Sequence, residues 1–93
     1  MVYKMAELKT VGVIGAGQMG NGIAHVAALA GYDVIMTDIS DEALAKGVTT
    51  IEGNMRRQVM RDMITDDAMM SGLKRIKTSS SIKAHENADI VIE

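Results

Sequence analysis

The chain has 93 residues, enough for one small domain, and its net charge is −2. It contains no cysteine, which excludes disulfide bonds, thiol chemistry and thiolate metal sites, and its two histidines have no partner at metal-ligand spacing. No apolar run approaches the roughly 20 residues that cross a bilayer, and the first residues lack the apolar stretch of a signal peptide. We therefore expect a cytoplasmic protein without a metal and without a membrane or nucleic-acid partner.

The first part of the sequence predicts a strand, a helix and a second strand. After a leader over residues 1–8, an apolar run spans 10–14. Helix-forming residues with apolar positions at helical spacing span 19–30, and Gly31 is expected to end this helix. A second apolar run covers 33–37. This alternation is typical of a parallel sheet in an α/β protein.

Three glycines lie where the first predicted strand turns into the helix. Gly15, Gly17 and Gly20 form a G-x-G-x-x-G pattern, and Asp38 follows 18 residues after the last glycine. The glycines allow a tight turn and the close approach of a pyrophosphate, whose charge the helix N-terminus favours. The Asp38 carboxylate would accept ribose hydroxyls and repel a 2′-phosphate, which favours NAD over NADP. The expected NAD-binding residues are Gly15, Ala16, Gly17, Gln18, Met19, Gly20 and Asp38.

A helical segment over residues 40–73 follows this acid. Ser40 is expected to cap a long helix that ends near Met63, and Gly47 and Gly53 are expected to weaken it. Its apolar stripe consists of Leu44, Val48, Ile51, Met55 and Val59. The connection is longer than a strand crossover requires, so we expect a helix–turn–helix arm with a use of its own.

The last predicted elements complete an α/β sheet. Thr65 is expected to cap a short helix to residue 73, and a short strand follows over 75–78. A helical turn within 82–87 leads to a fourth strand, 89–93, which we expect to be fully buried. The fold class is therefore a Rossmann-type parallel sheet of about four strands, truncated relative to the six-stranded doubly wound fold, with the arm after strand two.

The motifs together resemble the N-terminal, NAD-binding part of the 3-hydroxyacyl-CoA dehydrogenases, and the bacterial 3-hydroxybutyryl-CoA dehydrogenases in particular. The resemblance rests on the string GAGQMGNGIA from residue 15, on DISDEAL from residue 38, on the long arm, and on DIVIE from residue 89. It implies an oxidoreductase of fatty acid metabolism that interconverts (S)-3-hydroxyacyl-CoA and 3-oxoacyl-CoA with NAD. Short-chain substrates such as 3-hydroxybutyryl-CoA are expected, together with a homo-oligomeric parent protein.

The resemblance also suggests a use for the arm. Residues 54–83 carry seven Lys and Arg against three Asp, a pattern that fits either an anionic partner or an ordinary solvated helix face. In the family the arm contributes to coenzyme A binding through two polar positions, which fall here on Asn54 and Arg61. Seven residues make about two helical turns, so both would share one face.

The catalytic residues of the family lie later in the chain than this sequence reaches. We therefore expect residues 1–93 to be a partial NAD-binding domain without the catalytic half and the helical dimerisation domain, and to be inactive alone. No catalytic residue is assigned. His25 is expected to be a packing or surface residue and His85 a surface residue, while Glu93 matches a position beside the cofactor.

Two other interpretations stay open. Another G-x-G-x-M-G enzyme, of the β-hydroxyacid or 6-phosphogluconate dehydrogenase type, would share the glycine loop, although the long basic arm argues against it. Alternatively, the chain is a non-catalytic dinucleotide-binding or self-associating module, because its last strand would leave an unpaired edge.

Overall fold

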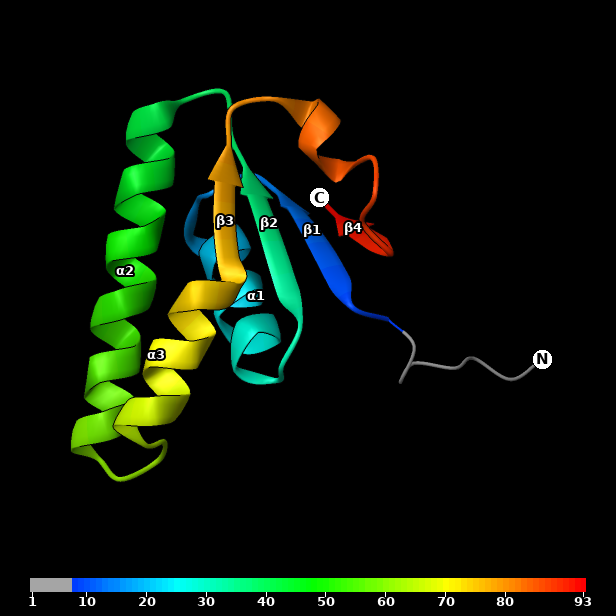
Figure 1. The fold of residues 1–93 in the computed structure, drawn as a ribbon. Helices are drawn as coiled ribbons and strands as arrows, with labels where there is room; N and C mark the ends of the chain where they lie inside the picture. The colour runs from blue at the N-terminus through cyan, green and yellow to red at the C-terminus, as the bar shows by residue number, and fades with distance from the viewer. Residues whose placement is uncertain (1–7) are drawn as a thin grey trace.

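The computed structural model describes residues 8–93. Figure 1 shows how its strands and helices follow one another along the chain. The elements are β1 (Thr10–Ile14), α1 (Gln18–Leu29), β2 (Asp33–Thr37), α2 (Asp41–Met60), α3 (Asp66–Arg75), β3 (Ile76–Ser79), the 3₁₀ helix η2 (Ile82–His85) and β4 (Ile90–Ile92). The expected order of elements is confirmed, and most boundaries move by only one or two residues.

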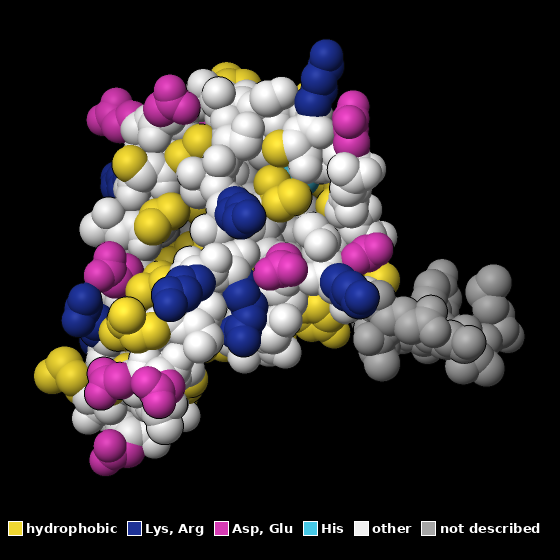
Figure 2. Space-filling model, in the orientation of Figure 1, with side chains coloured by type: hydrophobic (Ala, Val, Ile, Leu, Met, Phe, Trp, Pro, Cys, Tyr) yellow, Lys and Arg dark blue, Asp and Glu magenta, His cyan; other side chains and the backbone are white. Residues whose placement is uncertain are grey.

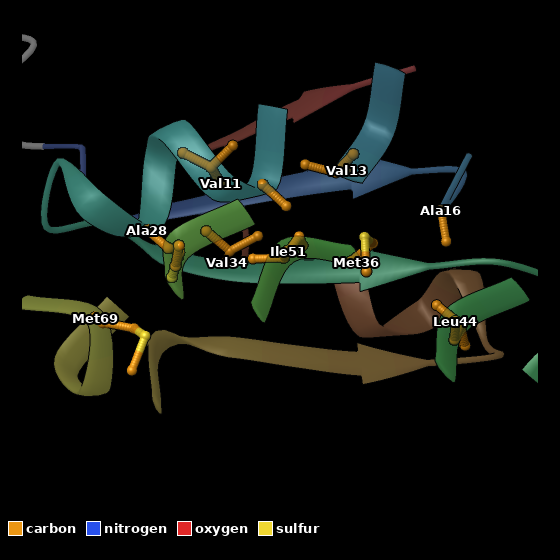
Figure 3. Close-up of a cluster of buried hydrophobic side chains, with 11 residues drawn as sticks. Val11, Val13, Ala16, Ala28, Val34, Met36, Leu44, Ile51 and Met69 are labelled. Carbon is orange, nitrogen blue, oxygen red and sulfur yellow. The ribbon is translucent and has the colours of Figure 1, made fainter. Parts of the chain in front are cut away.

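The four strands form one parallel sheet in the order β3-β2-β1-β4. Successive side chains of a β-strand point to opposite faces of the sheet, and the two faces of this sheet have different surroundings. The face toward α1 and α2 carries the core, in which Val13, Met36 and Ile51 are at most 1% exposed. Figure 3 shows these side chains between the sheet and the helices. The Rossmann-type α/β class is thus confirmed.

The arm consists of α2 and α3, which lie side by side and meet in a tight turn (Figure 1). Ser40 and Thr65 cap the two helices as expected, because their hydroxyl oxygens accept from Ala43 N at 3.1 Å and from Ala68 N at 3.0 Å. The first helix ends at Met60 rather than near residue 63. The reason is local: Asp62 adopts a φ of 57°, which an α-helix cannot continue.

The expectation of a fully buried fourth strand is wrong. Among residues 8–93, β4 is an edge strand that pairs with β1 alone, and Ile90 and Val91 are 42% and 41% exposed. An apolar run resembles a central strand in sequence, but burial requires a neighbour on both sides. Beside β4, Ile90 and Ile92 line an open apolar groove of about 570 Å³ together with Val26 of α1.

A carboxylate ties β4 to the first strand. Asp89 Oδ2 accepts hydrogen bonds from Lys9 N and Thr10 N, both at 2.8 Å, and Asp89 N donates to Thr10 O at 2.9 Å. The two backbone donors, from Lys9 first and then Thr10, lower the pKa of Asp89 below its usual value. This contact joins residues about 80 positions apart in the sequence.

The helices of residues 8–93 are too short or too polar to cross a membrane.

Candidate functional site

The glycine motif forms the turn between β1 and α1, at the carboxyl edge of the sheet. Gly15 has a φ of +100°, a left-handed conformation that favours glycine, and its N–H donates to Thr37 O at 2.7 Å. Gly17 is the N-cap of α1. No side chain of the described residues caps this helix, and its first turn carries no acidic residue. The N-terminus of α1 therefore offers backbone donors and a positive dipole end to an anion.

The three glycines differ in what surrounds their α-carbons. A Cβ on Gly20 would lie 1.8 Å from Gly15 O, so the helix crosses the loop too closely for any side chain. A Cβ on Gly17 would meet nothing within 4 Å. Gly20 is therefore required for packing, whereas Gly17 leaves open space before the helix N-terminus. This arrangement fits the pyrophosphate of a dinucleotide.

Asp38 directly follows β2 and contacts the glycine loop. Its Oδ2 accepts from Ala16 N at 3.0 Å and its Oδ1 from Ser40 N at 3.0 Å. These hydrogen bonds, with the Ala16 bond largest, lower the pKa of Asp38 below its usual value, so the group is a carboxylate at neutral pH. Asp38 therefore fixes the glycine loop through its hydrogen bond to Ala16 N, and it is also available to a ligand. The spacing of the motif does not show the contact with the loop.

Hollows lie on both sides of the loop. One, of about 220 Å³, lies beyond the end of β2 and is lined by Ile14, Thr37, Asp38, Ile39, Ser80 and Ile82. Another, of about 300 Å³, is lined by the loop, by Gln18 and Met19, and by Glu93. A third, of about 440 Å³, lies between Ala16 of the loop and α2. The structure thus brings all seven expected cofactor positions together. Ser80 and Ile82 were missed by sequence reasoning, because only the fold brings the turn after β3 beside Asp38. Thr37 was missed because the spacing of the motif does not show that its side chain lines this hollow.

Asn54 and Arg61 lie in the arm, well away from the loop. Asn54 is about 20 Å along α2 from the start of that helix, at 1.5 Å per residue, and its Oδ1 accepts from the Arg57 guanidinium. Arg61 is exposed and forms the C-cap of α2. In Figure 2 the Lys and Arg side chains are spread among acidic and apolar ones, and acidic side chains gather at the tip of the arm.

The two histidines differ in how well their positions were predicted. His25 packs against the arm, as expected, and its Nε2 lies 2.7 Å from Gln58 Oε1. The expectation that His85 is a surface residue is wrong, because this side chain is 8% exposed and bonds to Thr37. Its ring occupies the space that Gly12 leaves by having no side chain. A glycine inside a strand is the signal that could have indicated this close approach.

Within residues 8–93, His, Asp and Glu side chains form no group of three that could hold a metal ion.

Comparison with known proteins bears on the identity of this site. A family model described as "3-hydroxyacyl-CoA dehydrogenase, NAD binding domain" matches residues 10–93. The chain belongs to this family. The 3-hydroxyacyl-CoA dehydrogenase resemblance is thereby confirmed, and the family match supports NAD as the cofactor.

Relatives of known name agree with this membership. A 3-hydroxybutyryl-CoA dehydrogenase of Bradyrhizobium diazoefficiens is 51% identical over 88 residues, which cover 95% of this chain and 30% of that protein. A 3-hydroxyadipyl-CoA dehydrogenase of Escherichia coli is 42% identical over 89 residues, covering 96% and 19%. The crystal structure of (S)-3-hydroxybutyryl-CoA dehydrogenase from Ralstonia eutropha matches with a TM-score of 0.90 and 45% identity, covering 94% and 31%. The chain thus spans less than a third of the length of these relatives.

Proposed function

We propose that this chain is the NAD-binding part of an oxidoreductase that interconverts (S)-3-hydroxyacyl-CoA and 3-oxoacyl-CoA, with short-chain substrates such as 3-hydroxybutyryl-CoA. One observation carries the cofactor half of this proposal. The Asp38 carboxylate bonds to Ala16 N, so the acid and the glycine loop form a single unit at the uncapped N-terminus of α1. The substrate half rests on the names of the relatives.

Each group in the site has a distinct role in this proposal. The backbone amides at the start of α1 bind the pyrophosphate, and the space at Gly17 admits it. Asp38 accepts the ribose hydroxyls and repels a 2′-phosphate. NAD, when bound, supplies the acceptor for the substrate hydride. The protein's contribution within these residues is therefore to bind and orient the cofactor.

The cofactor role of Asp38 can be tested by titrating NAD and NADP against the chain in a calorimeter. We expect the unaltered chain to prefer NAD, and Asp38→Asn to bind NAD about tenfold more weakly, because a hydrogen bond to a charged group is lost. Asp33→Asn is the matched control, since Asp33 is an exposed acid at the opposite end of the same strand. Equal NAD affinity in all three proteins would contradict the role of Asp38.

We further propose that Asn54 and Arg61 bind the phosphate-bearing part of an acyl-CoA. Arg61 is exposed, and no ion pair holds it among the described residues. Arg61→Ala should weaken coenzyme A binding about threefold to tenfold, as expected for one charged contact. Arg56→Ala is the control, because Arg56 lies on the same helix but pairs with Glu52 at 2.9 Å. If both substitutions weaken binding equally, general positive charge rather than a site attracts the ligand.

A second candidate function is a non-catalytic dinucleotide-binding or self-associating module, which the exposed apolar side chains of Ile90 and Val91 on β4 favour. The two proposals agree that residues 1–93 alone do not turn over substrate. We expect no oxidation of NADH by the purified chain with acetoacetyl-CoA, and measurable oxidation would show that the catalytic groups lie within these residues.

Cytoplasmic location and homo-oligomerisation stay predictions. Analytical ultracentrifugation over a range of concentrations tests the oligomeric state.

A further inference from the structure

Thr37 and His85 form a buried polar pair on the face of the sheet that α1 and α2 leave free. Thr37 is 3% exposed and His85 is 8% exposed. Thr37 Oγ1 and His85 Nε2 are 2.7 Å apart. The other ring nitrogen, His85 Nδ1, is buried without a hydrogen-bond partner among residues 8–93. Buried polar atoms without partners are rare, so this pair requires an explanation.

The surroundings of Nδ1 indicate which ring nitrogen carries the hydrogen. A Cβ placed on Gly12 would lie 2.4 Å from Nδ1, so this nitrogen faces a C–H of Gly12 rather than an acceptor. A hydrogen on Nδ1 would be a buried donor with no acceptor, whereas a lone pair can face the C–H. We therefore assign a ring hydrogen to Nε2, which donates to Thr37 Oγ1.

This assignment leaves the hydrogen of the Thr37 hydroxyl available. Thr37 Oγ1 accepts from His85 and has no second hydrogen bond to a described residue. The same threonine lines the hollow of about 220 Å³ with Asp38, Ile39 and Ser80. A hydroxyl can accept and donate at once, so a buried donor lies beside the carboxylate proposed to hold the ribose.

We propose that Thr37 is a ligand of the adenosine half of the dinucleotide and that His85 is its positioning residue. In this arrangement Thr37 O–H donates to an acceptor atom of adenosine, a ribose oxygen or a ring nitrogen. His85 fixes the rotation of the hydroxyl by donating to its oxygen, and Gly12 provides the space that brings the ring within reach. This inference rests on the proposed function, because it assigns a residue to the same cofactor site.

The test is a calorimetric titration of ADP-ribose and of NAD against the chain and its variants. Thr37→Val removes the hydroxyl with little change in shape and should weaken both ligands about fivefold, the effect of one neutral hydrogen bond. Thr37→Ser keeps the hydroxyl and should bind within about twofold of the unaltered chain. Thr78→Val is the matched control, because Thr78 is an exposed threonine on the adjacent strand, and its affinity should not change.

A double-mutant cycle separates positioning from general support of the fold. His85→Leu should weaken ADP-ribose binding in the unaltered chain but add nothing when Thr37→Val is already present. Equal losses in both backgrounds would overturn the positioning role of His85. If Thr37→Val does not fold, by circular dichroism, His85→Leu in the unaltered background decides: weaker ADP-ribose binding supports the pair, and unchanged binding overturns it.

The outcomes also separate this inference from the proposed function. If the unaltered chain binds NAD and Thr37→Val binds it equally well, only the roles of Thr37 and His85 are wrong. If the unaltered, folded chain binds neither NAD nor ADP-ribose, the proposed function and this inference both fail.

Discussion

Gly20 and Gly22 lie two residues apart on α1, yet their α-carbons have opposite surroundings. A Cβ on Gly20 would collide with Gly15 O, whereas one on Gly22 would meet nothing within 4 Å. Gly20→Ala should therefore lower the free energy of unfolding by about 2–3 kcal/mol or more, since the contact is with backbone that cannot rotate away. Gly22→Ala should raise it by about 0.5–1 kcal/mol through higher helix propensity. Urea denaturation of both variants checks this, and equal effects would show that the loop does not cross α1 so closely.

The Asp89 carboxylate should make stability depend on acid pH. Its pKa is lowered by the backbone donors of Lys9 and Thr10, so its stabilisation is fully present above the ordinary value of 3.8 and is lost as pH falls through the lower, folded value. Asp89→Asn should be less stable than the unaltered chain at neutral pH. The difference in melting temperature should shrink as pH falls below about 4. A difference that stays constant down to pH 2 would contradict the role of this carboxylate.

For single residues, the sequence indicates positions that belong to a recurrent motif, and their cofactor role stays a prediction, whereas it gave the wrong environment for His85. The seven cofactor positions follow from spacing that recurs wherever a strand–turn–helix binds a dinucleotide. His85 gives no such signal, because its burial depends on a space at Gly12 more than 70 positions away in the chain. Contacts of that range depend on how the sheet assembles.

In the helix α2, the sequence predicted the cap and the apolar stripe but not the surroundings of the two glycines. Its cap at Ser40 and its apolar stripe follow from the sequence, and Leu44, Ile51 and Met55 are buried as the stripe predicts. Gly47 and Gly53 look alike in the sequence as weakening residues. In the structure Gly47 is buried against Ala16, with a Cβ position 2.9 Å from Ala16 O, while Gly53 is near only the Arg57 side chain. Gly47 is therefore the point where the arm approaches the glycine loop.

The different surroundings of Gly47 and Gly53 predict opposite effects on stability when each is replaced by alanine. Gly53→Ala should stabilise the chain by about 0.5–1 kcal/mol, because it adds helix propensity in available space. Gly47→Ala should destabilise it by about 1–3 kcal/mol, and it should also weaken NAD binding because the strain falls on the loop. Thermal unfolding and an NAD titration of each variant measure the two effects. Stabilisation by both substitutions would show that the arm does not approach the loop at Gly47.

Across the whole molecule, the observed order β3-β2-β1-β4 agrees with the Rossmann-type class predicted from the motifs, but the exposure of β4 was not predicted. The strands were recognised from their apolar runs, but such a run has the same appearance in a central strand and in an edge strand such as β4. Sheet order determines which loops meet, so it also determines that the turn after β3 lines the hollow beside Asp38. The cofactor site is therefore partly a property of one motif and partly a property of the assembled sheet.

The central claim is that one dinucleotide site lies at the carboxyl edge of this sheet, on both sides of the glycine loop. The most direct test is a titration of the ¹⁵N-labelled chain with NAD, followed by amide chemical shifts. The largest shifts should fall in residues 15–20, at 38–39 and in the turn over 80–82, while the tip of the arm over 61–65 should not respond. NAD binding that shifts the arm and leaves residues 15–20 and 38 unchanged would contradict the account.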